Sequence, residues 1–516
     1  MRRTGTAERW AFGQHRLGLA TGVVTIVVTA WGLARSALWL DEGATVVATQ
    51  RTWSDLWTLG EGAETPLLPY YVALKLFAGV ARTLAPALEH HPEILFRLPS
   101  VIVTVLAAWL LAAWASRLAP PRLVVAAGTM LLACSGFSRY GQEARPYAAV
   151  LFLAVVATVL WTTLADDPRP RWLVAYALSL TAMVVMHTFS AGLAGAHVLA
   201  ALVCLPAGRR GPVFWRTAGA GAVGVMLAAP AAVLSSRNGT GPLYVYPDVT
   251  PHDALTVFVR LFTLEESPLL GLGPVLILAL AGLFQVRPGP FSFIARLAAC
   301  WAVVPLLAMV PVLVVHPNLL FERYVLFVVP AWALLAGLGV VTLADLVPTR
   351  LGAVSALTLL LAGTLALQAG SHREIRQEDG HSEDVRPVLA LASQPPYADL
   401  PIVSSSRFGS VEIGAYAQAD EHRLVTHRVQ RDETAIWPAA VPETKARRLL
   451  QHHDQVILLQ RANSDPGCEQ ARVPVPVEEI ERCQPDLLKK LGFRVQRLEP
   501  SGTGWVFALM TRPDQQ

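Results

Sequence analysis

Charged residues are scarce in this 516-residue chain: they make up 16% of it, whereas 53% of the residues are hydrophobic and the mean hydropathy is +0.44. A soluble globular protein carries about 25% charged residues. The deficit lies in residues 17–370, where apolar runs alternate with short polar segments, and charge becomes dense again after Ser371. The composition excludes an ordinary soluble protein. It predicts a membrane domain, residues 1–371, followed by a soluble domain, residues 372–516.

The chain also lacks several sequence motifs, and their absence argues against some classes of protein. The chain has no Walker A motif, no CxxC pair and no HExxH segment, which argues against an ATP-driven pump and a zinc protease. We therefore expect no nucleotide or redox cofactor. Lysine occurs only four times, and no basic run with interleaved aromatic residues is present, so a nucleic-acid partner is not expected. The first apolar run has no small-residue cleavage site, which indicates a retained span and not a signal peptide.

Apolar runs long enough to cross a bilayer recur along the membrane domain. Eleven spans are predicted, near residues 17–37, 97–116, 123–138, 147–165, 172–189, 190–207, 213–234, 267–286, 297–315, 324–345 and 351–369. The run at 66–85 has Lys75 at its middle. If it lies along the interface, every arginine cluster between spans falls on the cytoplasmic side, as the positive-inside rule requires.

This assignment predicts a multi-pass plasma-membrane protein with a cytoplasmic N-terminus and an outer C-terminal domain. The first outer loop is then 38–96, with 66–85 as an interfacial or re-entrant helix. Nearly all acidic residues of the membrane domain fall on the outer side. We therefore expect the chemistry of the protein on that face.

The soluble domain alternates short apolar runs with helical segments, which predicts an α/β fold. Strands are expected at 401–403, 455–459 and 505–510, and helices at 444–453 and 485–491. Cys468 and Cys483 are its only cysteines. In an oxidising exterior they could form a disulfide or remain free thiols. Cys134, Cys204 and Cys300 lie in apolar spans and are expected to be small core residues.

Asp41 and Glu42 directly follow the first span. Acidic residues close to hydrocarbon are costly, so their position is a functional hypothesis by default. A carboxylate in low-dielectric surroundings is suited to accept a proton from a hydroxyl nucleophile. The alternative is a solvated pair that marks the interface. Glu64, farther along the same loop, could bind a metal or a sugar hydroxyl, or be an ordinary loop charge.

A second polar group follows the third predicted span, at Ser138–Tyr147, and includes Glu143, Arg145 and Tyr147. It is either a helix-end ion pair or a pocket floor whose arginine binds phosphate oxygens. His187 and the 316–324 segment lie at the outer ends of other spans. Arg323 begins a span on the outer side, against the positive-inside tendency. A bound anion would explain this, and Tyr324 is its neighbour.

Taken in order, these segments resemble the membrane-embedded C-type glycosyltransferases, in particular the branch with protein O-mannosyltransferases and the aminoarabinose transferases of lipid A. The resemblance covers about residues 15–345. The segments that carry it are Asp41-Glu42, Glu64-Thr65-Pro66-Leu67 with Tyr70-Tyr71, Arg97-Leu98-Pro99-Ser100, Gln142–Tyr147 and Arg323-Tyr324. The arginine-rich, lysine-poor composition is typical of high-GC actinobacterial proteins.

The resemblance implies a polytopic helical fold and an inverting transferase that moves a sugar, with mannose expected, from a polyprenyl-phosphate donor to a glycan, lipid or protein acceptor. Asp41, beside Glu42, would be the catalytic base, and Arg145 and Arg323 would bind the donor phosphate. The remaining candidates for a substrate or metal pocket are Glu64, Glu143, Tyr147, His187 and Tyr324. The resemblance leaves open whether the protein needs a divalent metal ion, for which Glu64 would be the ligand. Glu64 matches an acidic position that precedes a pair of prolines in the family, and in this chain Leu67 stands in place of the second proline. Membrane lipids would surround the bundle.

Two other functions are compatible with the topology. A transporter or flippase of lipid-linked sugars would carry internal repeats and charges at the membrane midplane, and the sequence shows neither. A non-catalytic envelope assembly protein would tolerate replacement of Asp41, Arg145 and Arg323.

Overall fold

The computed structural model describes most of the chain. The described residues are 4–238, 251–263, 268–315, 319, 321–381, 383–405, 407–416, 423–428, 434–436, 439–461, 477–500 and 504–512. Contacts divide them into two compact units. Unit 1 holds residues 1–31, 65–70 and 97–374; unit 2 holds 32–64, 71–96 and 375–516. Most of the first loop thus belongs to the same unit as the C-terminal domain.

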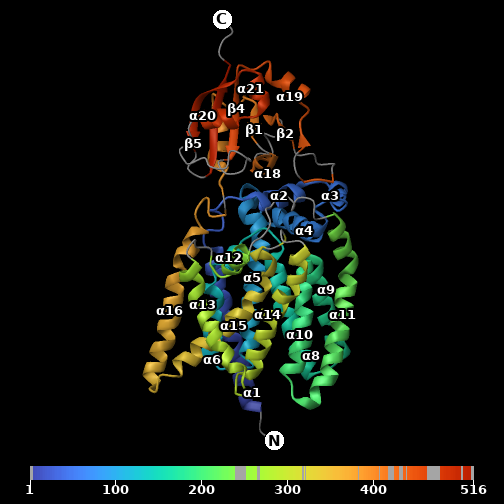
Figure 1. Ribbon diagram of the computed structural model, residues 1–516, viewed down its shortest axis with the longest axis vertical. Helices are drawn as coiled ribbons and strands as arrows, with labels where there is room; N and C mark the ends of the chain where they lie inside the picture. The colour runs from blue at the N-terminus through green and yellow to red at the C-terminus, as the bar shows by residue number, and fades with distance from the viewer. Residues whose placement is uncertain are drawn as a thin grey trace. The chain divides into compact units, whose positions relative to one another are not determined.

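Unit 1 is a bundle of apolar helices that run roughly alongside one another in Figure 1. In chain order they are α1 (Thr4–Ala30), α5 (Pro92–Ala115, with its first residues in unit 2), α6 (Pro121–Ala133), α7 (Ser135–Gly141), α8 (Tyr147–Asp166), α9 (Pro170–Met186), α10 (Gly192–Val203), α11 (Ala207–Asn238), α12 (Pro251–Arg260), α13 (Pro268–Leu283), α14 (Ser292–Val315), α15 (Val329–Ala344) and α16 (Arg350–Glu374). Short 3₁₀ segments add η1 (Thr65–Leu67), η3 (Thr188–Ala191), η5 (Phe284–Val286) and η7 (Glu322–Val328).

The predicted multi-pass helical domain is confirmed. Within the described residues, seven helices are long and apolar enough to cross a membrane, an eighth candidate is the bent pair α6–α7, and shorter apolar helices lie at 16–30, 170–186, 188–203 and 274–286. Apart from Thr65–Leu84, each of these coincides with one of the eleven predicted spans. Thr65–Leu84 also has the length and hydropathy of a span. The side of the membrane that each end faces stays a prediction.

Two predicted spans differ from the observed helices. The first was expected to reach residue 37, but α1 ends at Ala30, and Gly32 adopts φ of +70°, the left-handed conformation that commonly follows a helix end. The span at 123–138 was expected to be one helix, but it bends by 68° between α6 and α7. At the break, the backbone N–H of Ser135 donates to Phe262 O at 3.1 Å. A Cβ at Gly136 would lie 2.4 Å from Leu261 O, so close backbone packing requires glycine there.

The segment Gly219–Gly224 has the GxGxxG spacing of a dinucleotide-binding loop, but it lies inside α11 and not between a strand and a helix. At Gly224 a Cβ would lie 2.6 Å from Ala177 O of α9. This glycine therefore allows two helices to approach closely.

Unit 2 begins with the first loop, which folds into α2 (Leu40–Gln50), α3 (Trp53–Leu59), α4 (Leu68–Leu84, with its first turn in unit 1) and η2 (Pro86–His90). Lys75, the lysine within the apolar run, lies on α4. Its Nζ donates to Thr49 O at 2.9 Å and to Arg51 O, at the C-terminal end of α2. It also lies 5.2 Å from the Trp53 ring centroid. A cation at a helix C-terminus is favourable, so the lysine ties the helices of the loop together.

The C-terminal domain has the predicted α/β fold. Its main sheet has the order β1-β4-β6-β5, with β1 parallel to β4 and the other pairs antiparallel; helices surround the sheet in Figure 1. The strands are β1 (Ile402–Ser404), β2 (His427–Arg428), β3 (Ala439–Ala440), β4 (Gln455–Arg461), β5 (Arg494–Pro500) and β6 (Trp505–Thr511), with β2 and β3 forming a separate pair. The helices are α17 (Arg386–Ala392), α18 (Arg407–Tyr416), α19 (Glu443–Leu450), α20 (Val477–Cys483) and α21 (Asp486–Lys490).

All three predicted strands and both predicted helices of this domain are present. The strand β5 was not predicted. It lies at the edge of the sheet, and its charged residues Arg494, Arg497 and Glu499 obscure the alternation of apolar and polar residues that is typical of a strand. Cys483 is disulfide-bonded, whereas Cys134, Cys204 and Cys300 are free thiols. Cys468, the other half of the predicted pair, lies outside the described residues.

If α4 lies along the outer interface, both of its ends are on one side of the membrane. We expect cysteines at Glu61 and Glu89, two exposed positions that flank α4, to react with a membrane-impermeant thiol reagent on intact cells. Lys489→Cys in the C-terminal domain should react equally, and Arg117→Cys should react only after the membrane is permeabilised. Labelling of Glu61→Cys and Glu89→Cys from opposite sides would show that α4 spans.

Candidate active site

The acidic pair occupies the first turn of α2, which begins at Leu40. The partial positive charge of a helix N-terminus stabilises carboxylates there. The two side chains differ in exposure. Glu42 is fully buried, with 0% of its surface exposed, whereas Asp41 is only partly buried. Of the two predicted catalytic carboxylates, Asp41 is therefore the more exposed, and Glu42 faces the interior of unit 2.

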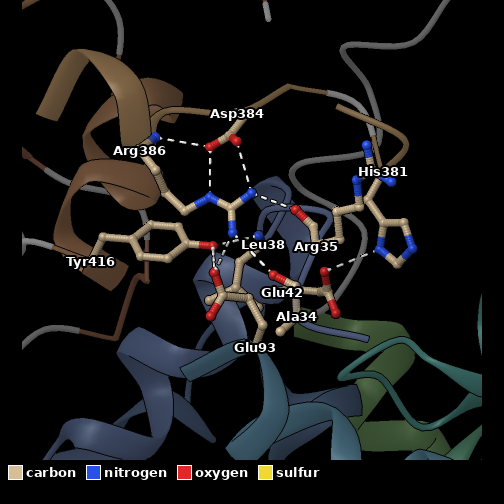
Figure 2. A network of polar contacts seen from close by, with 9 residues as sticks. All are labelled: Ala34, Arg35, Leu38, Glu42, Glu93, His381, Asp384, Arg386 and Tyr416. Carbon is tan, nitrogen blue, oxygen red and sulfur yellow. Dashed lines mark hydrogen bonds and ion pairs between the residues drawn. The ribbon is translucent and has the colours of Figure 1, made fainter. Parts of the chain in front are cut away.

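Glu42 contacts a histidine from the segment that leads into the C-terminal domain. His381 Nδ1 lies 3.5 Å from Glu42 Oε2, and 1% of the histidine side chain is exposed. Figure 2 shows the imidazole directed at this carboxylate. A buried carboxylate is costly unless a positive charge or hydrogen bonds compensate it. His381 was not predicted as a site residue, because it lies in a charged segment that contains no recognisable motif.

Arg386 connects the same loop to the C-terminal domain (Figure 2). Its guanidinium pairs with Asp384 at 2.7 Å and with Glu93 at 2.8 Å. It also donates to the carbonyls of Ala34 and Arg35, at 3.2 and 2.6 Å. Although burial lowers the pKa of Arg386, its hydrogen bonds and the nearby carboxylates raise it above the ordinary value. These bonds fix the chain just before α2.

Tyr416, at the end of α18, takes part in this network. Its hydroxyl donates to Glu93 Oε1 at 2.9 Å and accepts from the backbone N–H of Leu38 at 2.7 Å. Within this network, Asp384 and Arg386 are close in the sequence, whereas Glu93 and Tyr416 are far from them and from each other. No local pattern could have predicted that they meet.

Glu64 is buried near the middle of the loop, directly before η1, and its Oε2 accepts a hydrogen bond from the Tyr71 hydroxyl at 2.7 Å. In the part of the chain that the structure describes, no three His, Cys, Asp or Glu side chains gather as metal ligands. Glu64 alone is not a sufficient donor set for a bound divalent ion.

The Ser138–Tyr147 block lies in unit 1 and forms buried polar pairs. Glu143 pairs with Arg139 at 2.6 Å, and the Ser100 hydroxyl donates to Glu143 O at 2.6 Å. The Tyr140 hydroxyl donates to Glu322 Oε1 at 2.5 Å, which ties α7 to η7. Arg139 and Tyr140 belong to the block that the sequence singled out, but their partners were not predictable.

Aromatic side chains cluster beside these pairs. The Tyr324 ring centroid lies 4.7 Å from that of His187 and 6.1 Å from that of Tyr147. The Arg323 guanidinium lies 4.4 Å from the Phe321 ring centroid and 5.8 Å from that of Tyr324. The structure thus brings Tyr147, His187, Arg323 and Tyr324 together within unit 1. Arg145 is buried two residues before Tyr147. Of the predicted 316–324 segment, residues 316–318 and 320 lie outside the described residues.

No protein-family model and no curated protein matches the chain. Solved structures do match it. ArnT from Cupriavidus metallidurans bound to undecaprenyl phosphate has a TM-score of 0.56 and 14% identity, over 95% of this chain and 97% of that one. AglB, the archaeal oligosaccharyltransferase of Archaeoglobus fulgidus, in complex with an inhibitory peptide and a dolichol-phosphate, gives 0.52 and 12%, over 86% and 69%.

The Archaeoglobus fulgidus oligosaccharyltransferase in complex with zinc and sulfate gives a TM-score of 0.51 and 14% identity, over 95% of this chain and 73% of that one. The chain has the C-type glycosyltransferase fold. At these identities the likeness concerns the fold, and it includes both the helical bundle and the C-terminal domain, because nearly the whole chain is covered.

A buried ionic group in the C-terminal domain gives the unit a pH-dependent stability. Burial raises the pKa of Glu412 to about 8; the Arg461 charge lowers it and the Glu383 charge raises it. Arg461 pairs with Glu383 and lies 3.7 Å from Glu412 Oε1. A raised folded-state pKa means that the folded protein binds the proton more tightly than the unfolded chain. The stability that this contributes is present at low pH and is lost as pH rises through about 8.

We expect Glu412→Gln to remove this dependence. Relative to wild type, the variant should gain stability between pH 5 and pH 8, by at most about 1.4 kcal/mol per pH unit. Pulse proteolysis of the C-terminal domain in the full-length protein measures the difference. Glu478→Gln, on the exposed face of α20, is the control and should keep the wild-type profile. Parallel profiles for Glu412→Gln and wild type would contradict the assignment.

Proposed function

We propose that this protein is an inverting glycosyltransferase that uses a polyprenyl-phosphate sugar as its donor. The observation that carries the proposal is the fold, which matches a structure holding undecaprenyl phosphate over 95% of the chain and one holding dolichol-phosphate over 86%. The accessible carboxylate of Asp41, in the first turn of α2, supports a base-catalysed transfer.

In the proposed reaction, the carboxylate of Asp41 accepts the proton of an acceptor hydroxyl. The acceptor oxygen forms a bond to the anomeric carbon from the face opposite the phosphate, and the bond from that carbon to the phosphate oxygen breaks. The polyprenyl phosphate leaves with the electron pair, and the configuration inverts. Arg145 and Arg323 stabilise the charge that develops on the phosphate. The rings of Tyr147, His187 and Tyr324 offer apolar faces for the sugar or the first isoprene units.

The finer assignments follow from the resemblance seen in the sequence. Mannose is the proposed sugar, and the acceptor is a glycan, lipid or protein of the cell envelope. The reaction takes place at the outer face of the plasma membrane, with membrane lipids around the bundle. No step requires a metal. A neighbour of this fold is crystallised with zinc, so transfer is measured with EDTA and with added Mg²⁺ or Mn²⁺.

Asp41→Asn should reduce transfer by about 100- to 10,000-fold, because an amide cannot accept the proton. The measurement is release of undecaprenyl phosphate and labelling of envelope acceptors by the purified protein, with undecaprenyl-phosphate mannose, glucose and aminoarabinose as donors. Glu61→Gln, an exposed acidic residue of the same loop, is the control and should retain wild-type activity. Wild-type transfer by Asp41→Asn would remove this residue from the mechanism. Movement of the donor across vesicle membranes without transfer would instead support a flippase.

Arg323→Met should lower kcat/KM for the donor by about 100-fold, since it removes one charged donor from the leaving phosphate. Arg145→Met should act in the same direction. Steady-state kinetics with varied donor measure both effects, and binding of undecaprenyl phosphate alone should weaken in parallel. Arg237→Met, at an exposed position of α11, is the control. Unchanged kinetics in both variants would contradict the proposed phosphate site.

A further inference from the structure

The segment that follows the last span reaches the loop that carries Asp41. The backbone N–H of Ala37 donates to Glu378 O at 2.9 Å. Tyr416 binds the backbone N–H of Leu38 at 2.7 Å. Together with the Arg386 bonds to the Ala34 and Arg35 carbonyls, these contacts hold the chain over several consecutive residues up to the start of α2. The backbone that enters the catalytic turn is therefore shaped by residues 375–416.

The other side of the catalytic turn is packed against α18. A Cβ placed on Gly43 would lie 3.5 Å from Val411 Cγ1 and 3.6 Å from Glu412 Cα. α18 also ends at Tyr416, the residue that binds Leu38. Gly43 directly follows the acidic pair, and even an added Cβ would make only ordinary van der Waals contact there, so α18 lies directly beside the turn. This packing limits the motion of the turn but does not set its rotation about the helix axis.

The contact between Glu42 and His381 bears on the rotation of α2 about its axis. Both side chains are almost completely buried, and Nδ1 lies 3.5 Å from Oε2. A carboxylate in such surroundings keeps its place only beside a compensating group. Asp41 and Glu42 are neighbours on one helical turn, so a helix held with Glu42 toward His381 has the Asp41 side chain about 100° around the axis. Asp41 is the more exposed of the pair, as this arrangement requires.

We propose that His381 is a positioning residue for the transfer reaction, which orients the base Asp41 by binding the buried carboxylate of Glu42. The inference rests on the proposed function for the role of Asp41. It also assigns the C-terminal domain a part in the active site: its leading segment supplies a side chain on which the catalytic turn depends. His381 contacts Glu42 and not Asp41, so its effect on the reaction is indirect.

The test compares His381→Phe, which keeps a ring of similar size but cannot donate a hydrogen bond, with His381→Asn, which retains an N–H near the Nδ1 position. Glu42→Gln and the double variant His381→Phe/Glu42→Gln complete a mutant cycle. His452→Phe, an exposed histidine of the same domain, is the matched control. Each variant is assayed in the full-length protein for kcat and for donor KM with the undecaprenyl-phosphate sugar that the wild type uses. Hydrogen exchange of the peptide 38–50 is measured in parallel.

We expect His381→Phe to lower kcat by about 10- to 100-fold with little change in donor KM, because a small displacement of a catalytic group has this cost. His381→Asn should restore most of the loss. The double variant should be no worse than the more damaged single variant, because both changes break one interaction. Exchange in 38–50 should be faster in His381→Phe, while that of the β4 and β6 strands stays unchanged, which separates local loosening from failure to fold.

A His381→Phe variant with wild-type kcat and wild-type exchange would overturn the inference while leaving the proposed function intact. Additive losses in the cycle, or a His381→Asn variant as impaired as His381→Phe, would also overturn it. If the wild type transfers no sugar, the proposed function fails by that result. Exchange of 38–50 then still decides whether His381 holds the turn.

Discussion

Compensation of buried carboxylates is the constraint on which the polar parts of this structure depend. Glu42 faces His381, Glu93 faces Arg386 and Tyr416, Glu143 faces Arg139, and Glu322 accepts from Tyr140. Each carboxylate would be costly in low-dielectric surroundings without its partner. In each case the partner comes from a different element or a different turn. Satisfying the charge therefore also fixes how these elements pack.

This constraint explains why most of the first loop belongs to the same unit as residues 375–516. The loop contains short helices that could not be stable alone. Arg386, Tyr416 and His381 provide the hydrogen bonds and charges that its buried backbone and acidic groups need. A catalytic carboxylate has to be held within a fraction of an ångström of its productive position. Under the proposed function, the contacts made by the C-terminal domain would help to hold Asp41 in this way.

Features that depend on local sequence were predictable, whereas features that depend on contacts between distant residues were not. The spans were predictable because each records a local requirement, about 20 apolar residues. The break at Cys134 was not, since its cause is the approach of residues 260–262 to Gly136. Apolar strands such as Trp505–Thr511 were found from their composition, whereas the charged edge strand Arg494–Pro500 was missed. The polar blocks were found because charge stands out against an apolar background, but their partners were not.

The sequence by itself determined the class of the protein, the positions of its apolar helices and the candidate residues Asp41, Arg145 and Arg323, because hydropathy and charge are written residue by residue. Only the tertiary structure decided that Glu42 is buried while Asp41 stays accessible, and that His381, Arg386 and Tyr416 hold the turn between them. Such contacts join residues more than 300 positions apart. They form only because the fold brings distant segments together, and no local sequence pattern predicts which segments meet.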